Sequence, residues 1–153
     1  MAADIANNRK AYHDFHILEK IEAGIELKGT EVKSLRAGKV QLRGAFAHIT
    51  GGELFLCNAD IQPYERASHE QHDPKRRRKL LLHRREIDGI IGKIEREGRT
   101  LVALRLYWRD GHVKAELGLA KGKVDADRRA DLKKRAQSRE TDRLLASIQR
   151  RKN

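Results

Sequence analysis

Two pairs of histidines with the same spacing are the first candidates for chemistry in this 153-residue chain. His13 and His16 lie three residues apart, and His69 and His72 repeat that spacing. A zinc site also needs cysteine or carboxylate ligands in a matching pattern, and neither pair is accompanied by one. We therefore interpret these histidines as solvated or RNA-facing residues, and we expect neither a metal nor a cofactor.

Asp73 is the strongest candidate for a catalytic group, because it lies between His72 and a run of cations that would attract RNA. A metal-dependent nuclease needs several converging carboxylates, and the sequence offers no such set. A phosphate-binding loop of the GxxxxGK(S/T) type is also missing from the sequence. We expect a protein that is not an enzyme, with a magnesium-dependent ribonuclease as the weaker alternative.

The charge of the chain points to phosphate-bearing partners. A formal net charge of +12 and a sequence pI near 10.1 favour RNA above all. No apolar run is long enough to span a membrane, and the first ten residues lack the apolar segment of a signal peptide. Cys57 is the single cysteine and lies among apolar residues, as a buried thiol would in a reducing cytosol. The sequence thus predicts a cytoplasmic protein without a membrane partner.

More than half of the positive surplus lies at the C-terminal end. Residues 120–153 hold 12 Lys and Arg against 5 Asp and Glu, a surplus of +7. Ordering about thirty residues costs roughly 45 kcal/mol, whereas the five large aliphatic residues there return about 2 kcal/mol each on burial. We predict that residues 121–153 form a tail that is disordered in solution and becomes helical when phosphates neutralise its cations.

Alternation and turn signals before residue 120 indicate short antiparallel strands. Residues 15–27 alternate with a period of two, with Glu19 as an exception that marks a bend. Gly51-Gly52 divides residues 40–61 into a hairpin, and Asp110-Gly111 does the same for residues 100–119. Strands therefore dominate the first 120 residues.

Two helices are predicted between these strands. The first runs from Glu31 to Ala37, with Thr30 as its N-cap and Gly38 at its C-terminal end. The second carries isoleucines at i, i+3, i+4 and i+7 from Ile87 and is closed by Gly98. Residues 62–79 are polar, contain two prolines and end in five cations, so we expect an exposed loop there.

Short antiparallel strands joined at hairpin spacing are most simply closed as a small barrel, because closure leaves no exposed edges. We predict a mainly β protein with a small closed antiparallel OB-like β-barrel over residues 9–120, flanking short helices and a disordered basic C-terminal tail. Residues 1–8 would form a flexible N-terminus. An OB-like barrel is a common scaffold for RNA binding.

The residues alone leave the interface open. The candidate contacts are basic or polar and are Asn8, Arg9, Lys10, Lys33, Arg36, Lys39 and Lys75 to Lys79. A solvated cationic surface explains each of them equally well. Glu22 by itself indicates a surface charge, and Leu81 a core residue.

Five blocks, in order and over essentially the whole chain, resemble the bacterial SsrA-binding protein family, also called small protein B. They are NRKAYHDFHI, IEAGIELKGTEVKSLRAGKV, DPKRRRKLLLHRREID, LVALRLYW and ELGLAKGK. The resemblance implies a non-catalytic factor, monomeric, that binds transfer-messenger RNA (tmRNA) and delivers it to stalled ribosomes for trans-translation. The barrel would grip the tRNA-like part, and the tail would enter the vacant decoding centre and mRNA channel of the small subunit. Elongation factor Tu would arrive with the charged RNA.

The resemblance also implies roles for individual residues. It places Asn8, Arg9, Glu22 and Leu81 against tmRNA, and we add the cations Lys10, Lys33 and Arg36 as further contacts. In the tail it places Gly122 and Asp127-Arg128-Arg129 at the decoding site, and we add the cations Lys123, Lys133, Lys134 and Arg135. Arg128 replaces the family's usual Lys, and Ala126 stands where the family often has a His or Tyr able to stack on a ribosomal base.

A different class of protein would share the same composition. A structural ribosomal or assembly protein could thread a basic tail through ribosomal RNA permanently. Such a component would remain on salt-washed ribosomes in stoichiometric amounts, whereas a delivery factor would not.

Overall fold

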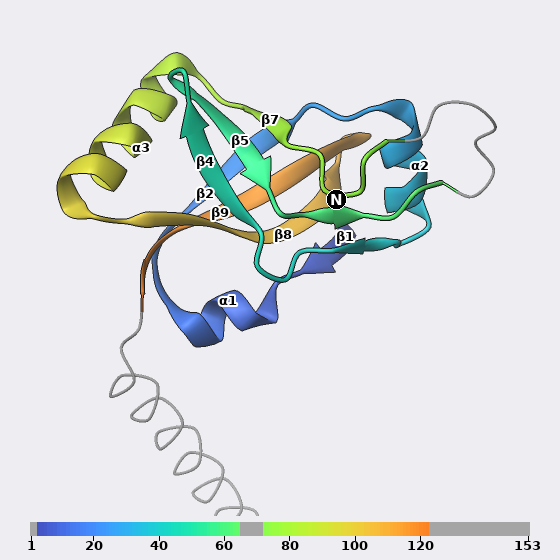
Figure 1. Ribbon diagram of the computed structural model, residues 1–153, viewed down its shortest axis with the longest axis horizontal. Coiled ribbons are helices and arrows are strands. Elements are labelled where there is room, and N and C mark those ends of the chain that lie inside the picture. Colours follow the sequence, from blue (N-terminus) through green and yellow to red (C-terminus); the bar gives the residue numbers. More distant parts are fainter. Residues whose placement is uncertain (1–2, 65–71, 123–153) are drawn as a thin grey trace, which may run out of the picture. The chain divides into compact units, whose positions relative to one another are not determined.

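The strands and helices of the first 122 residues are defined by a computed structural model that describes residues 3–64 and 72–122 (Figure 1). In chain order they are β1 (Ala3–Asn7), α1 (Arg9–Asp14), β2 (Phe15–Ile25), α2 (Gly29–Arg36), β3 (Val40–Gln41), β4 (Phe46–Thr50), β5 (Glu53–Cys57), β6 (Asp60–Ile61), β7 (Arg78–Leu81), α3 (Arg84–Glu97), β8 (Thr100–Arg109) and β9 (His112–Gly122). The prediction of a mainly β protein with short helices is confirmed.

The strands pair antiparallel in a ring-like sheet. The order is β1-β8-β4-β5-β7-β2-β9, and β9 pairs again with β8. β8 reaches two partners on one edge because β4 meets it at Val102 and β1 meets it at Arg105–Trp108. The pairing around the ring is shortest between β4 and β8, where Phe46 pairs with Val102. β3 and β6 form a separate two-stranded sheet.

Both predicted hairpins are present, with the turn chemistry that the sequence indicates. Gly51 and Gly52 have φ angles of 59° and 76°, and Asp110 and Gly111 have φ angles of 51° and 78°. Two consecutive residues with positive φ define the turn that matches the right-handed twist of a hairpin. The predicted bend at Glu19 is also present as an irregularity in the pairing of β2 with β9 between Ile17 and Glu19.

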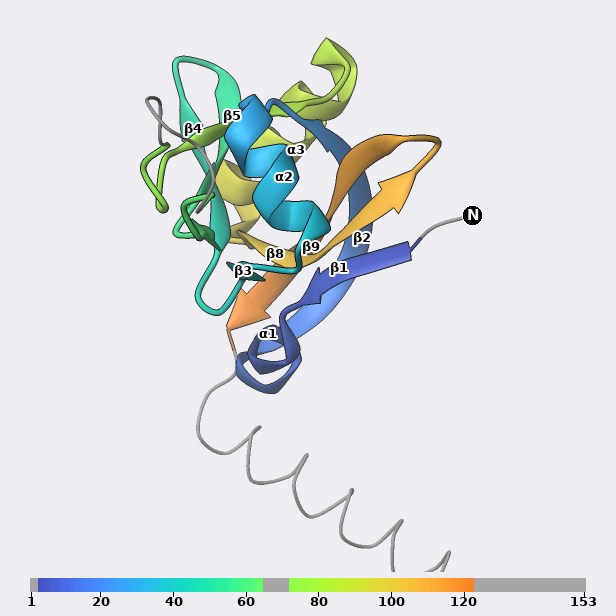
Figure 2. The ribbon, with the colours of Figure 1, turned by 90° about the vertical axis from the view of Figure 1, so that its right-hand side faces the viewer.

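The two longer helices lie at opposite ends of the ring (Figures 1 and 2). α3 buries Ile87 and Ile90 and ends at Gly98, whose φ of 65° is left-handed, as predicted. The predicted start of α2 was wrong, because the helix begins at Gly29 and its N-cap is Lys28 rather than Thr30. The Lys28 N–H donates to the Glu31 carboxylate over 2.7 Å, which satisfies one of the free N–H groups of the first turn.

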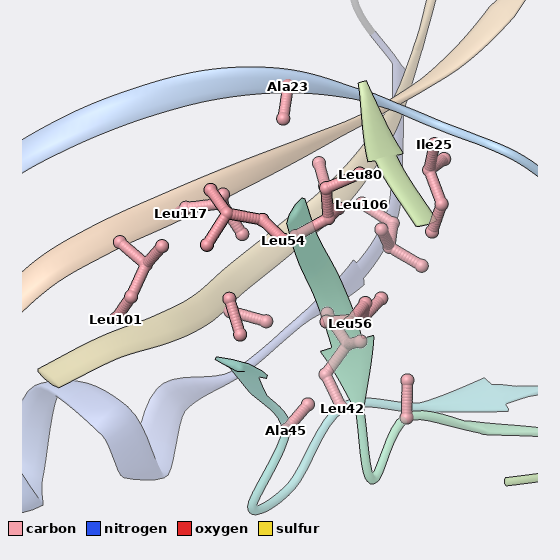
Figure 3. Close-up of a cluster of buried hydrophobic side chains, with 14 of the residues drawn as sticks. Ala23, Ile25, Leu42, Ala45, Leu54, Leu56, Leu80, Leu101, Leu106 and Leu117 are labelled. Atoms are coloured by element: carbon pink, nitrogen blue, oxygen red, sulfur yellow. The ribbon is translucent and has the colours of Figure 1, made fainter. Parts of the chain in front are cut away.

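Leucines from four strands fill the interior of the ring (Figure 3). Leu54 and Leu56 of β5, Leu80 of β7, Leu106 of β8 and Leu117 of β9 are completely buried. They belong to one apolar cluster that also takes in Ile87 and Ile90 of α3. The core therefore holds strands β5, β7, β8 and β9 together with helix α3 in one apolar cluster.

A second, smaller apolar cluster lies under α1. It consists of Ala11, Val102, Leu104 and Ala120, with Phe15 and Ile17 packed against it. Gly118 makes this packing possible, since a Cβ atom there would lie 2.9 Å from the Leu104 side chain. The close approach fixes α1 and the start of β2 against β8 and β9.

The N-terminal segment differs from the predicted flexible residues 1–8. Ala3–Asn7 form β1, which pairs with β8 from Ala3–Trp108 to Asn7–Arg105. Asp4 also receives a hydrogen bond of 2.6 Å from Arg105. The segment lacks strong alternation, and its order comes from the edge of β8, which is distant in sequence.

The predicted exposed loop over residues 62–79 was wrong at its C-terminal end. Within the described residues, His72 is buried, and Arg78 is completely buried at the start of β7. The Thr30 hydroxyl lies 2.9 Å from His72 Nδ1, and His72 Nε2 lies 2.8 Å from the Ile61 carbonyl oxygen. Polar composition indicated solvent, but these side chains find partners on α2 and β6 instead.

Arg78 and Glu31 form a buried ion pair between β7 and α2. The Arg78 Nε donates to Glu31 Oε2 over 2.5 Å, and both side chains are completely buried. Arg78 also donates to the Ala59 carbonyl over 2.8 Å and to the Pro74 carbonyl over 3.1 Å. Arg76 adds a bond of 2.6 Å to Glu31 Oε1. This one carboxylate therefore joins α2, β7 and the chain segment before β7.

The boundary of the tail also differs slightly from the prediction. β9 continues to Gly122, two residues past the predicted end of the barrel. The predicted tail helix and its residues lie outside the residues that the structure describes.

Replacing Glu31 with Gln should destabilise the protein strongly. The change leaves the Arg78 guanidinium buried without a counter-charge, and breaking a buried pair from one side costs about 3–5 kcal/mol. Denaturant unfolding of wild type and E31Q measures the loss in free energy of unfolding. The exposed Glu95→Gln change on α3 serves as the control and should alter that free energy little. Equal stability of E31Q and wild type would contradict the proposed importance of the pair.

The same pair should make the protein sensitive to acid. Burial raises the pKa of Glu31, but the hydrogen bonds from Arg76, the Lys28 N–H and Arg78 outweigh it and hold that pKa below the ordinary 4.5. A lowered folded-state pKa stabilises the fold above pH 4.5, and this contribution is lost as pH falls through the lowered value. The stability difference between wild type and E31Q should therefore be largest above pH 4.5 and shrink below it. A pH-independent difference would contradict this assignment.

Candidate nucleic-acid interface

Glu22 and Leu81 line one hollow on the surface. From the residues alone, Glu22 was interpreted as a surface charge and Leu81 as a core residue. β2 carries Glu22 and β7 carries Leu81, and the two strands pair through Gly24–Leu81 and Ile25–Leu80. The hollow has a volume of about 370 Å³ and is also lined by His83 and Lys114. We call this space the Glu22 hollow.

Gly24 brings the backbone of β2 close to the Leu81 side chain. A Cβ atom on Gly24 would lie 3.2 Å from Leu81 Cβ, which is closer than packed side chains usually allow. Leu81 remains 48% exposed, one of four large hydrophobic residues exposed among those described. An exposed aliphatic side chain beside a hollow offers a flat apolar support that a nucleotide base can cover.

The Glu22 carboxylate is held by two neighbours through a single oxygen. The Tyr107 hydroxyl donates to Glu22 Oε2, and Arg109 donates to the same atom over 2.5 Å. No interaction of the described residues engages Glu22 Oε1. The carboxylate is therefore fixed in place and keeps one oxygen able to accept a hydrogen bond from a ligand.

These contacts keep Glu22 ionised and Tyr107 protonated. The hydrogen bond from Tyr107, followed by that from Arg109, lowers the pKa of Glu22 below its ordinary 4.5 in spite of some desolvation. Burial, followed by the bond to Glu22, raises the pKa of Tyr107 to about 12. At neutral pH the group is thus a pure acceptor, which can read an N–H or O–H donor of RNA.

The two arginines of β8 near Glu22 are already neutralised. Arg105 pairs with Asp4 over 2.6 Å and with Glu116 over 3.2 Å, and Arg109 pairs with Glu22. Arg105 also lies over the Tyr107 ring, 4.3 Å from its centroid. This face of β2, β8 and β9 is consequently an ordered network of charges and offers few free cations to phosphate.

Asn8 lies in the framework. It is 5% exposed, its side-chain amide donates to the Ala103 carbonyl over 2.8 Å, and its carbonyl oxygen accepts from the Ala11 N–H over 3.3 Å. Asn8 is thus the N-cap of α1 and links that helix to β8. Asn8 also lines the space between α1 and the segment at Val40–Arg43, and it positions the residues that follow it, while its contact with tmRNA stays a prediction.

Arg9 and Lys10 follow Asn8 on α1 and are exposed. Neither makes an ion pair or side-chain hydrogen bond in the part of the chain that the structure describes. Both side chains line a second hollow between α1 and the segment at Val40–Arg43, with a volume of about 580 Å³. Uncompensated cations next to a hollow are suited to phosphate.

Lys33 and Arg36 share α2 and each lie against an aromatic ring. The Lys33 ammonium is 5.3 Å from the Tyr64 ring centroid, and the Arg36 guanidinium is 5.8 Å from that of Trp108. Cation–π contacts orient these charges without neutralising them. The Glu31–Arg78 pair in turn fixes the helix that carries both residues.

The run from Lys75 to Lys79 is not a uniform cationic surface. Arg76 and Arg78 bind Glu31, and Arg77 donates to the Thr50 hydroxyl over 2.5 Å. Lys79 lies 3.9 Å from Glu53. Arg78 is buried and so is not accessible to RNA in this structure, whereas Lys75 and Arg77 are the exposed members without an acidic partner among the described residues.

Several residues of the site were missed by sequence reasoning. Tyr107, Arg109 and Gly24 shape the Glu22 hollow, and Arg43 lines the space beside Lys10. Alternation along β8 places Tyr107 and Arg109 on one face, but nothing in the local sequence indicates that Glu22 faces them. The pairing of β2 and β8 with β9 supplies that information.

Candidates for catalysis gain no support from their surroundings. Asp73 Oδ1 accepts a hydrogen bond of 3.0 Å from the Lys75 N–H, as a turn residue does, and His72 is buried. The described residues include no group of three or more His, Cys, Asp or Glu able to hold a metal ion.

Two other expectations concern Cys57 and the membrane. Cys57, expected to be buried, is half-buried. No helix among residues 3–64 and 72–122 is long and apolar enough to cross a membrane.

A ring of antiparallel strands with a fixed acceptor, an exposed aliphatic residue and uncompensated cations defines a class of RNA-binding protein, and comparison with known proteins agrees. The family model described as SmpB protein matches residues 5–147. Because that match spans most of the sequence, the chain belongs to the SmpB family, whose members are RNA-binding factors and not enzymes.

Individual relatives are similar over nearly their whole length. The SsrA-binding protein of Carboxydothermus hydrogenoformans is 57% identical over 92% of this chain and 95% of its own length. That of Geobacter sulfurreducens is 55% identical over 92% of both chains. A solved chain described as "tmRNA-SmpB: a journey to the center of the bacterial ribosome" is 52% identical, with a TM-score of 0.65 over 80% of this chain and 90% of that one.

Replacing Tyr107 with Phe should raise the pKa of Glu22 toward 4.5, because the bond from Tyr107 is the largest cause that lowers it. Carbon-detected NMR titration of the glutamate carboxylates measures this shift. Tyr12→Phe, at an exposed tyrosine on α1, is the matched control and should leave the Glu22 pKa unchanged. An unaltered Glu22 pKa in Y107F would show that the cations Arg109 and Lys114 lower it without help from Tyr107.

Proposed function

We propose that this protein binds tmRNA and delivers it to stalled ribosomes, with the ring-like sheet holding the tRNA-like part of the RNA. The observation that carries the proposal is the Glu22 hollow, where an ionised acceptor with one free oxygen lies beside an exposed leucine. Membership in the SmpB family and the names of its relatives give the class of RNA.

Each part of the Glu22 hollow contributes a different contact. Glu22 Oε1 accepts a hydrogen bond from a base or ribose donor, and Leu81 supports the face of an unstacked base. Lys114 lines the same hollow and meets the adjacent phosphate. Tyr107 and Arg109 are positioning residues, since they act on RNA through Glu22.

Cations elsewhere on the same unit extend the contact along the RNA backbone. Arg9 and Lys10 on α1, and Lys33 and Arg36 on α2, neutralise phosphates and add salt-dependent affinity. Asn8 serves by fixing α1, because its amide is engaged with Ala103 and Ala11. The contacts thus divide into readout by the hollow and attraction by the helices.

The tail supplies the second half of the function. Gly122 ends β9, and the residues that would follow it into the decoding centre and mRNA channel are Lys123, Asp127, Arg128, Arg129, Lys133, Lys134 and Arg135. These positions would fold as a helix on ribosomal RNA. The protein would act as a cytoplasmic monomer, and elongation factor Tu would bring the charged tmRNA with it.

Glu22→Gln should weaken tmRNA binding by about 10- to 100-fold, because a charged acceptor contributes more than a neutral one and the amide presents a competing donor. Leu81→Ala should weaken it as well. Filter binding with tmRNA, and with an unrelated structured RNA over a range of salt concentrations, measures both effects. Glu95→Gln on α3 is the control. Equal affinity of wild type for the two RNAs at every salt concentration would refute specific binding.

Replacing Asp127, Arg128 and Arg129 together should separate the two halves of the function. Binding to tmRNA should remain at the wild-type level, whereas tagging of peptides on stalled ribosomes should be lost. A reconstituted tagging reaction run beside the filter assay gives both values. Loss of binding and tagging together would contradict the division between the ring-like sheet and the tail.

A further inference from the structure

A pocket beside Phe46 has features of a nucleotide site that the proposed function does not use. It lies between α1, the start of β2 and the segment at Arg43–Phe46, and has a volume of about 280 Å³. Ligand pockets usually begin at about 300 Å³, so this space suits a group about the size of one base. We call it the Phe46 pocket.

Its floor is apolar and its rim is cationic. Phe15, Phe46 and Val102 supply aromatic and aliphatic surface, and Lys10 and Arg43 lie at the edge. Phe46 is 38% exposed, on the opposite face of β4 from its neighbour Ala47, which is buried. Phe46 and Leu81, both large exposed apolar residues, each line a hollow, and the Leu81 hollow is the one that the SmpB resemblance marks.

The cations at the rim are free to bind an anion. Neither Lys10 nor Arg43 makes an ion pair or side-chain hydrogen bond among the residues that the structure describes. Asp14 also lines the pocket, but its carboxylate lies 2.9 Å from His13 Nδ1. This contrasts with Arg105 and Arg109, whose charges are compensated by carboxylates.

We propose that the Phe46 pocket binds one unstacked nucleotide of tmRNA, with the base stacked on Phe46 and its phosphate held by Lys10 and Arg43. Aromatic faces bind bases of any sequence, and cations next to them bind the backbone, which is the common pattern for single-stranded RNA. This inference rests on the proposed function and adds a second point of contact to it.

The position of the pocket supports tmRNA as the source of the nucleotide. Phe15 in the pocket and Glu22 in the Glu22 hollow lie on the same strand, seven residues apart, or at most about 23 Å at about 3.3 Å per residue. Two base-sized sites at that separation on one rigid unit would hold a folded RNA at two of its unpaired nucleotides. A helical duplex would not fill both, because its bases are stacked inside.

Phe46→Ala should weaken tmRNA binding by about 5- to 100-fold, the usual effect of losing one base stack. Phe46→Trp retains an aromatic face and should bind within a few-fold of wild type. The salt dependence should distinguish the partners in the pocket: F46A should leave the slope of log affinity against log salt unchanged, whereas R43A and K10A should each reduce it by about one.

Matched controls separate the pocket from general effects. Leu18→Ala removes a large exposed apolar residue that lines neither the Phe46 pocket nor the Glu22 hollow, and Arg96→Ala removes an exposed cation on α3. L18A should keep wild-type affinity, and R96A should keep the wild-type salt slope. Thermal unfolding of all variants verifies that the fold is retained.

A direct measurement identifies the ligand. A photoreactive phenylalanine analogue at position 46 of the full chain should cross-link to one unpaired nucleotide of tmRNA. Normal tmRNA affinity of F46A, or cross-links spread over base-paired stretches, would overturn the proposal, as would an effect of F46A confined to ribosome binding. If wild type itself fails to prefer tmRNA, the proposed function falls; if wild type prefers tmRNA and F46A matches it, this inference alone falls.

Discussion

The buried pair between Glu31 and Arg78 is the interaction on which the arrangement of the site depends. It joins α2, which carries Lys33 and Arg36, to the start of β7, which carries Leu81 three residues later. Taking two charges out of water is unfavourable unless their remaining hydrogen bonds are satisfied, and here Arg76, the Lys28 N–H and two backbone carbonyls satisfy them. A hydrophobic contact could hold these elements together, but the directions of these hydrogen bonds also fix their register.

The sequence predicts those parts of the fold that short-range patterns encode. The turns at Gly51-Gly52 and Asp110-Gly111 and the isoleucine face of α3 follow from backbone conformation and helical period, and all are present. Strand β1 and the burial of Arg78 were not predictable in this way, because Arg78 depends on a partner 47 positions away and β1 on partners about 100 positions away. The run of five cations predicted solvent exposure for all its members. Arg78 is buried instead, because the Glu31 carboxylate on α2 pairs with it.

The candidate site was predictable only through resemblance, and the structure supplies a physical reason. Glu22 as an isolated letter in an alternating strand indicates a surface charge, and Leu81 in KLLLH indicates core. Their shared hollow arises because Gly24 pairs with Leu81, and the fixed carboxylate arises because β9 brings β8 beside β2. Asn8, which the resemblance marks as a contact, is also a buried helix cap, and its contact with tmRNA stays a prediction.

An ionised carboxylate in a chain of charge +12 bears on selectivity. The cations attract any RNA, and this attraction carries no information about sequence or shape. Glu22 acts in the opposite direction, because its free oxygen repels a phosphate and is satisfied only by a donor placed at one point. In the proposed interface, an RNA that presents a backbone segment there would lose affinity, whereas one that presents an N–H or O–H group would gain it. Tyr107 and Arg109 both bind Oε2 and so hold the carboxylate in one orientation. The carboxylate therefore cannot rotate to avoid a phosphate placed beside Oε1. Specificity in such a basic protein would therefore rest on an acidic group whose partner cation, Arg109, engages only one of its two carboxylate oxygens.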